Sequence, residues 1–400
     1  MIIIPKFHKL IRLNNHVTII SFLQFKKSVL VLGPYKKSYE RNHRGQDYQL
    51  NDAYFFTVVC TYLISFVFGV WSIGKWLKSS YIFTESDLDY VRLTFSGWDW
   101  ATRTRSSAAL GKKNIEKEIL ELLEEEKFQS DRLNADKTNK LNRLRTLLMM
   151  LSVIIIIADC VLVYYSKVYK EYPMNAYQLA MVVWLIVDVS YFIFGAIAKY
   201  EKYSKHTELL LAVLRNVCTY YASLYILIFC LVQKSKKDCC WEDDIGEQMY
   251  ALLITSILSE LAFVLYTLLT RLKAKYVVQY PELKVEKQAA HVIKLQAISW
   301  IGILWAPLIP LVTLVPLFVV IVANCINIFA LELKPKQVFR VIRAKFQFLV
   351  AVQVGLWLDI LICLYILFFK DPSDSCTPYR NDPTPFRSTS IFKLITPNIR

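Results

Sequence analysis

Residues Leu295 to Leu331 form the charge-free run LQAISWIGILWAPLIPLVTLVPLFVVIVANCINIFAL. An α-helix rises about 1.5 Å per residue, so a single helix of this length would be nearly twice as long as the ~30 Å hydrocarbon core of a bilayer. Pro307 and Pro310 lie near the middle of the run. Proline has no backbone N–H to donate and disfavours helix in the residue before it. The run therefore predicts two membrane-spanning helices joined by a turn at these prolines.

Six more apolar runs have the ~20 residues that a helix needs to cross a bilayer. They cover residues 54–76, 146–166, 178–198, 209–232, 249–270 and 346–369. The composition agrees, because 55% hydrophobic residues is high for a chain that must keep a wettable surface. The sequence therefore predicts an all-α integral membrane protein with about eight transmembrane helices.

The Lys and Arg residues of the connecting segments predict the orientation, because cytoplasmic loops carry an excess of them. One set of alternate connections holds 27 basic residues and the other holds 5. The basic set is expected in the cytoplasm and comprises residues 77–145, 199–208, 271–294 and 332–345. The other set is expected outside the cell, together with the tail at 370–400, and comprises 167–177, 233–248 and the Pro307 turn.

The N-terminal segment, residues 1–53, starts outside in this topology although it carries nine basic residues. That position is contrary to the charge rule for a segment that precedes a first helix. A span at Val17 to Gly33 is one alternative, but Lys26 and Lys27 at its centre would be costly in lipid. The segment is therefore expected to be extracellular, or to follow a further span that is missing from this chain.

Side chains that serve catalysis or cofactor binding are scattered. The five histidines lie far apart, and the sequence has no HExxH, GxxxxGK[ST], GxSxG or CxxC pattern. The net charge of +15 comes from Lys and Arg between the apolar runs rather than from one basic stripe, which argues against a nucleic-acid partner. The sequence therefore predicts no enzyme, no cofactor and no metal site, in a protein surrounded by membrane lipids.

Four acidic residues lie near the centres of predicted spans, where a charge is costly, namely Asp159, Asp188, Glu260 and Asp359. Arg215 lies nearer to one helix end. Such groups usually face a bundle interior or a water-filled path, and an excess of acids attracts cations. The pattern favours a cation pathway. The alternative is a neutral acid hydrogen-bonded to a neighbouring helix, or an ion pair of Arg215 with Asp188 or Glu260.

The 77–145 segment contains an amphipathic helix. Its apolar face carries Ile115, Ile119, Leu122 and Leu123, and charged residues occupy the other face. Such a helix can pack along the membrane surface or on the bundle, or it can dock into the groove of a partner protein. The sequence leaves both interpretations open.

Three of the nine cysteines lie on predicted extracellular segments, namely Cys239, Cys240 and Cys376. The redox state outside the cell permits a disulfide there. The sequence does not decide whether Cys239 or Cys240 would pair, and Cys240 with Cys376 is the candidate pair.

The stretch that begins at Cys240 has the sequence CWEDDIGEQMYAL and precedes a predicted span. It resembles the Cys-Trp-Glu and Gly…Tyr signature of the transmembrane channel-like (TMC) family, with matches at Cys240, Trp241, Glu242, Gly246 and Tyr250. Further matches follow in the order of the family: Phe95 to Trp100 with Trp98 and Asp99; Gln296 to Pro307 with Trp300, Gly302 and Pro307; the basic Phe339 to Lys345; and Cys376 to Tyr379. Five matches in register with the topology make the resemblance specific over about residues 50–380.

The resemblance implies a ten-helix fold similar to that of anoctamin scramblases and hyperosmolality-gated channels. It also implies a mechanically gated cation channel in the plasma membrane, typically a homodimer. The chain fits spans two to nine of the family, so it is expected to be a fragment or short isoform without the first span and without the last, through which family members dimerise. The helix around Ile115 to Leu123 would be where small EF-hand calcium- and integrin-binding proteins dock.

The family's pore groove is lined by its fourth to seventh helices, which correspond here to residues 178–198, 209–232, 249–270 and 291–307. The pore-lining candidates on them are Asp188, Arg215, Ser223, Ser256, Glu260 and Gln296. Two acidic positions of the family fall on Ser256 and Lys284, which puts calcium permeability in doubt. Glu260 lies one helical turn after Ser256 on the same face and is expected to supply a displaced charge.

Two other functions fit the same features. A lipid scramblase or lipid-regulated transporter of the same superfamily would use a polar furrow that is open to lipid head groups. A non-conducting interaction subunit would not need the missing end helices.

Overall fold

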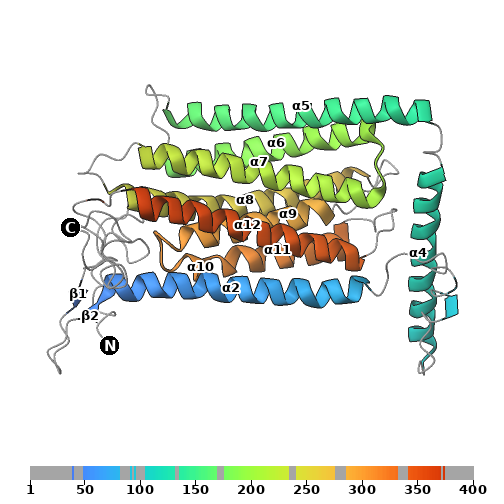
Figure 1. Cartoon of the computed structure of the whole chain (residues 1–400), viewed down its shortest axis with the longest axis horizontal. Helices are drawn as coiled ribbons and strands as arrows, with labels where there is room; N and C mark the ends of the chain where they lie inside the picture. Colours follow the sequence, from blue (N-terminus) through green and yellow to red (C-terminus); the bar gives the residue numbers. More distant parts are fainter. Residues whose placement is uncertain are drawn as a thin grey trace.

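The computed structural model describes residues 38–39, 48–81, 91, 94–95, 104–130, 135–168, 175–233, 240–274, 285–331, 341–370 and 373. Long helices lie side by side in a bundle (Figure 1). The elements are β1 (Ser38–Tyr39), β2 (Tyr48–Gln49), α2 (Leu50–Tyr81), α4 (Arg105–Ser130), α5 (Ala135–Val168), α6 (Ala176–Glu201), α7 (Lys205–Gln233), α8 (Trp241–Ala274), α9 (Val285–Gly302), α10 (Ile309–Val312), α11 (Leu314–Ile326), the π-helical turn η4 (Asn327–Leu331) and α12 (Val341–Phe369). The two short strands pair antiparallel just before α2.

The prediction of an all-α integral membrane protein is confirmed. Seven helical stretches in the described part of the chain are long and apolar enough to cross a membrane. They are Asp52–Lys78, Asn139–Val168, Ala176–Glu201, Thr207–Gln233, Trp241–Thr270, Ile309–Phe329 and Lys345–Phe369. Each overlaps one of the apolar runs of the sequence, whereas the orientation of the helices in the membrane stays a prediction.

The long apolar run folds as two helical arms around a break. α9 ends at Gly302, and helical structure resumes at α10, whose first turn contains Pro310. A Cβ atom on Gly302 would lie 2.5 Å from Cδ1 of Ile309, so only glycine permits this close approach of the two arms. Tyr62 of α2 donates a hydrogen bond to the carbonyl of Trp300 and thereby ties the end of α9 to the bundle.

The structure differs from the prediction at the start of this hairpin. α9 begins at Val285, ten residues before the charge-free run, so residues 285–294 are helix rather than part of a basic loop. His291 and Lys294 are buried in the bundle, with 5% and 3% of their surface exposed. Aromatic and acidic side chains of α6, α7 and α8 surround this charged part of α9, which lets it pack inside. Because of its charged residues, α9 is not among the seven stretches that are long and apolar enough to cross a membrane.

The burial of the helices places α7 at the centre. Within the protein itself, 67% of the apolar stretch of α7 is buried, against 11% for α2 and 17% for α5. α7 contacts α5, α6 and α9, whereas α2 packs mainly on α12 (Figure 1). The exposed apolar faces of α2 and α5 suit contact with lipid, and the helices that carry buried polar residues are the inner ones.

α4 lies crosswise at one end of the bundle, near the end of α5 and beyond the ends of α2 and α12 (Figure 1). Its composition is polar on average, with an apolar stripe, as an interfacial or docking helix requires. Its C-terminal end precedes α5 in the chain, with residues 131–134 between them.

Candidate functional site

Charged side chains meet where α6, α7, α8 and α9 pack together. We call this set the α6–α9 charged cluster; it comprises Asp188, Glu260, Glu286, Lys287, His291 and Lys294, with the rings of Trp184, Tyr191 and Tyr220 around them. Glu260 attracts Lys287 of α9, Asp188 attracts Lys294 of the same helix, and the two carboxylates repel each other. Their role in a pore stays a prediction.

Glu260 of α8 and His291 of α9 are in contact within the cluster. Atom Nδ1 of His291 lies 3.3 Å from Oε2 of Glu260, and both side chains are buried. Gln288, one turn before His291, also hydrogen-bonds the Glu260 carboxylate. Among the described residues, Oε1 of Glu260, Oε1 of Gln288 and Nε2 of His291 have no hydrogen-bond partner. Buried polar atoms of this kind are costly unless water or an ion reaches them.

Lys294 is the buried cation of the cluster. Its Nζ lies 5.3 Å from the ring centroid of Trp184 and 5.7 Å from that of Tyr220, which is the range of cation–π attraction. The half-buried Asp188 of α6 attracts the same ammonium. Trp184 is held by its own hydrogen bond, in which Nε1 donates to the carbonyl of Leu252 on α8 over 3.2 Å.

Lys287 lies about two helical turns before Lys294 on α9. Its Nζ is 3.7 Å from the ring centroid of Phe263 on α8 and 5.9 Å from that of Tyr191 on α6. The hydroxyl of Tyr191 donates to Oε1 of Glu286 over 3.3 Å. The cluster therefore contains both signs of charge. Residues 285–294 bring two lysines into the bundle beside the acids, and whether the acids set the ion selectivity stays a prediction.

Two of the four membrane-depth acids lie elsewhere and have hydrogen-bond partners. Ser190 of α6 donates to Oδ2 of Asp159 on α5 over 2.6 Å. Tyr225 and Tyr221 of α7 donate to the two carboxylate oxygens of Asp359 on α12, over 3.0 Å and 3.5 Å. Asp159 and Asp359 therefore match the alternative interpretation, in which an acid at membrane depth is hydrogen-bonded to a neighbouring helix. Asp159 connects α5 with α6, and Asp359 connects α12 with α7.

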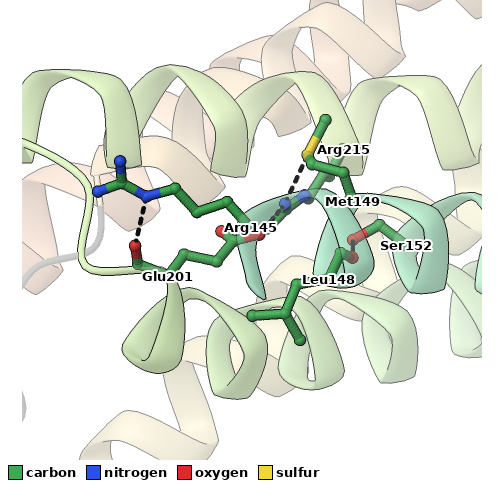
Figure 2. Close-up of polar contacts among 6 residues, drawn as sticks. All are labelled: Arg145, Leu148, Met149, Ser152, Glu201 and Arg215. Carbon is green, nitrogen blue, oxygen red and sulfur yellow. Dashed lines mark hydrogen bonds and ion pairs between the residues drawn. The ribbon is translucent and has the colours of Figure 1, made fainter. Parts of the chain in front are cut away.

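Arg215 of α7 is paired with neither Asp188 nor Glu260. Its Nη1 donates to Oε2 of Glu201 over 3.0 Å and its Nη2 contacts Oε1 of the same residue, with both side chains at least 94% buried (Figure 2). Glu201 is the last residue of α6, and it lies at one end of the helix, where Arg215 can reach it. The sequence did not single out Glu201 because the predicted α6 span stopped at residue 198.

A second arginine completes this ion-pair cluster. Arg145 of α5 donates from Nε to the carbonyl of Glu201 over 2.9 Å and from Nη2 to the carbonyl of Lys202 over 2.6 Å. Its guanidinium also lies 4.3 Å from the ring of Tyr203. Lys202 adopts the left-handed conformation that ends α6, so Arg145 satisfies the free carbonyls of a helix C-terminus. These contacts join α5, α6 and α7 at one end (Figure 2), and we assign the cluster a structural role.

The remaining pore-lining candidates are less informative. Ser223 of α7 and Ser256 of α8 are fully buried, and Ser256 donates to the carbonyl of Leu253 in its own helix. Gln296 of α9 is half-buried. Lys284 lies outside the described residues. Their role in a pore stays a prediction.

The Cys240 segment forms the first turns of α8. Trp241 and Tyr250 are buried, and Gly246 is buried between them. Oε1 of Glu242 accepts a hydrogen bond from the backbone N–H of Ser373 over 2.8 Å, which connects the start of α8 with the chain beyond α12. Its position in the first turn also suits the positive end of the helix dipole. These residues therefore hold the bundle together rather than face a path.

Cys240 is disulfide-bonded. The other six described cysteines are free. Cys376, the candidate partner, and Cys239 lie outside the described residues, as do Trp98 and Asp99 of the family resemblance.

The apolar face of α4 is partly open. Ile115, Ile119 and Leu122 are half-buried, whereas Leu123 is 48% exposed. The residues thus share a helix as predicted, and the nature of their partner stays a prediction.

Four members of the charged cluster were not predicted as site residues, namely Glu286, Lys287, His291 and Lys294. Lys287, His291 and Lys294 occupy positions i, i+4 and i+7 of one helix, which places them on one face. That spacing was the available signal, but it was hidden because residues 285–294 were counted as a basic loop.

Comparison with known proteins supports the same family as the sequence motifs. A family model of the TMC domain matches residues 240–342, the part that begins at Cys240 and contains α8 to α11. This match and the relatives below support a protein of the transmembrane channel-like family. It is similar to transmembrane channel-like protein 5 of Rattus norvegicus, with 24% identity over 90% of this chain and 39% of the relative. Transmembrane channel-like protein 8 of Mus musculus is 22% identical over 96% of this chain and 57% of the relative.

A third relative is named for the ion that it carries. The human protein named voltage-gated chloride channel TMC4 is 26% identical over 47% of this chain and 30% of the relative. The relatives are named as channels or channel-like proteins and not as enzymes, which supports a channel-like role for the family. The chain spans about two fifths of the length of the first relatives it matches.

Proposed function

We propose that this chain is the pore-forming part of a mechanosensitive cation channel in the plasma membrane, and that ions pass along the α6–α9 charged cluster. One observation carries the proposal: Asp188 and Glu260, on two different helices, each attract a lysine of α9, Lys294 and Lys287 respectively, inside a bundle of apolar spans. Ionisable groups are costly in a membrane and usually mark an ion path. The family's channel-like relatives support the same role.

The burial of the cluster agrees with a closed path. Glu260, His291 and Lys294 are at least 95% buried, which leaves no room for a hydrated ion beside them. Opening would separate α6 from α8 and α9, because these helices contribute the facing side chains. Tension in the membrane is the proposed stimulus, since it favours conformations of larger cross-section.

The test is the ion selectivity of the complete protein in patch-clamp recordings with stretch applied to the membrane. The variant Glu260→Gln removes one acid at nearly constant size, so the ratio of sodium to chloride permeability should fall severalfold. Asp159→Asn is the matched control, because it also neutralises a buried acid at membrane depth but lies outside the cluster. Unchanged conductance and selectivity in Glu260→Gln would show that this carboxylate does not act on permeant ions.

A chloride pathway is the second candidate. Lys287 and Lys294 give the cluster positive charge, and one relative is named as a voltage-gated chloride channel. The same recordings separate the two candidates. Replacing external chloride with gluconate would shift the reversal potential if chloride is carried, whereas replacing sodium with N-methylglucamine would shift it if cations are carried.

We also propose that α4 binds small EF-hand calcium- and integrin-binding proteins through its apolar face, and that the complete protein works as a homodimer. The exposed Leu123 and half-buried Ile119 support a docking face. Pull-down of such a protein should be lost with Ile119→Glu and Leu123→Glu and retained with Lys113→Glu, which changes an exposed charge of the same helix. Binding that survives both apolar substitutions would contradict the proposed interface.

A further inference from the structure

The surroundings of Lys294 form a site for a cation. Its ammonium lies between two aromatic rings, 5.3 Å from Trp184 and 5.7 Å from Tyr220, and only 3% of the residue is exposed. The faces of aromatic rings attract cations by their quadrupole, and Trp does so most strongly. The carboxylate of Asp188 attracts the same ammonium. Two rings and a carboxylate are the chemistry that recognises an ammonium-type cation.

The site is built by elements other than the one that carries the lysine. Trp184 and Asp188 belong to α6 and are one helical turn apart, and Tyr220 belongs to α7. The two rings pack on each other with centroids 5.7 Å apart, and Tyr220 is fully buried. The hydrogen bond from Trp184 to Leu252 on α8 fixes the orientation of its ring. The rings are therefore held in place independently of Lys294.

We propose that Trp184, Tyr220 and Asp188 form a binding site for monovalent cations, and that Lys294 fills it in this closed structure as a cation tethered to α9. This inference rests on the proposed cation pathway, and it adds the site and the side chain that control it. In the closed structure, Lys294 excludes permeant cations by occupying the site and by repulsion between like charges. When the pore opens, α9 withdraws the ammonium and a cation from solution takes its place.

The first experiment tests binding without any current. Lys294→Ala in the purified complete protein leaves the two rings and the carboxylate without their cation. Its melting temperature should rise with millimolar methylammonium, which replaces the missing ammonium, whereas wild-type protein should not respond. Lys345→Ala is the matched control, because Lys345 lies 5.0 Å from the Trp76 ring but at the contact of α12 and α2. Adding Trp184→Leu to Lys294→Ala should abolish the response.

The second experiment tests control of the pathway. Lys294→Met preserves the length of the side chain and removes the charge, so the ratio of cation to chloride permeability should rise by roughly tenfold. Lys294→Arg, which keeps the charge, should stay close to wild type, and it remains informative if Lys294→Met fails to fold. If methylammonium affects the melting of Lys294→Ala no more than that of wild type, the cation site is refuted. If it does stabilise the variant but the complete protein carries no current, the proposed function fails and the site stands.

Discussion

Removing the carboxylate of Glu201 should destabilise the bundle more than the loss of any ordinary surface charge. Glu201 is 1% exposed and makes two contacts with Arg215, which is itself 6% exposed. Glu201→Gln leaves the guanidinium of Arg215 buried without an opposite charge. Removing one partner of a buried ion pair typically costs about 3–5 kcal/mol. A glutamine can still accept one hydrogen bond, so we expect a loss at the lower end, about 3 kcal/mol.

The design isolates the ion pair from the second arginine. Arg145 binds the backbone carbonyls of Glu201 and Lys202, and these contacts do not depend on the side chain of Glu201. The double variant Glu201→Gln with Arg215→Met removes both charges and keeps an apolar side chain of similar length. It should be less destabilised than the sum of the two single variants, because two buried groups that depended on each other are removed together.

The assay is reversible denaturation of the purified complete protein in detergent, followed by tryptophan fluorescence. Glu116→Gln is the control, because Glu116 is an exposed acid on α4. If Glu201→Gln unfolds at the same midpoint as wild type, or if the double variant is as unstable as the sum of the single variants, the buried pair does not join α6 and α7 as argued.

Three further predictions concern other contacts of the bundle. Peptide mapping without reductant should recover Cys240 linked to Cys376, and a link from Cys240 to any other cysteine would show that the candidate pair is wrong. Gly302→Ala should destabilise the protein by about 1–3 kcal/mol through overpacking, and adding Ile309→Val should recover part of this loss because it removes the Cδ1 atom at 2.5 Å. A thermal melt of both variants checks this, and unchanged stability of Gly302→Ala would contradict the close approach of the two arms. Asp359→Leu should cost more stability than Asp359→Asn, because asparagine still accepts a hydrogen bond from the α7 tyrosines, and equal melting of the two variants would count against these bonds.

The sequence predicted the spans because the cost of unpaired backbone groups in lipid requires long apolar helices. Each of the seven membrane-crossing stretches overlaps an apolar run that is visible in the sequence. The break after Gly302 lies where Pro307 and Pro310 were expected to interrupt a helix. The prediction was less successful where charge and burial coincide, since the charged first half of α9 has the composition of a loop and the environment of a core.

The partners of the membrane-depth charges could not be predicted, because a hydrogen bond between helices depends on their relative rotation and height. Asp159 and Asp359 face neighbouring helices, whereas Asp188 and Glu260 face α9, although all four have similar surroundings in the sequence. Arg215 finds Glu201 because both lie at the same end of the bundle.

The amino-acid sequence by itself therefore determined that this is a multi-span membrane protein with a resemblance to the TMC family, because hydrophobic length and the residues of the Cys240 segment are local properties. Only the tertiary structure decided which charges meet. The packing of α9 against α6, α7 and α8 brought Lys294 to Trp184 and Tyr220, and it turned a set of apparent pore acids into a cluster of both signs. That outcome depends on contacts between residues far apart in the chain, and the spacing of residues along one helix does not contain it.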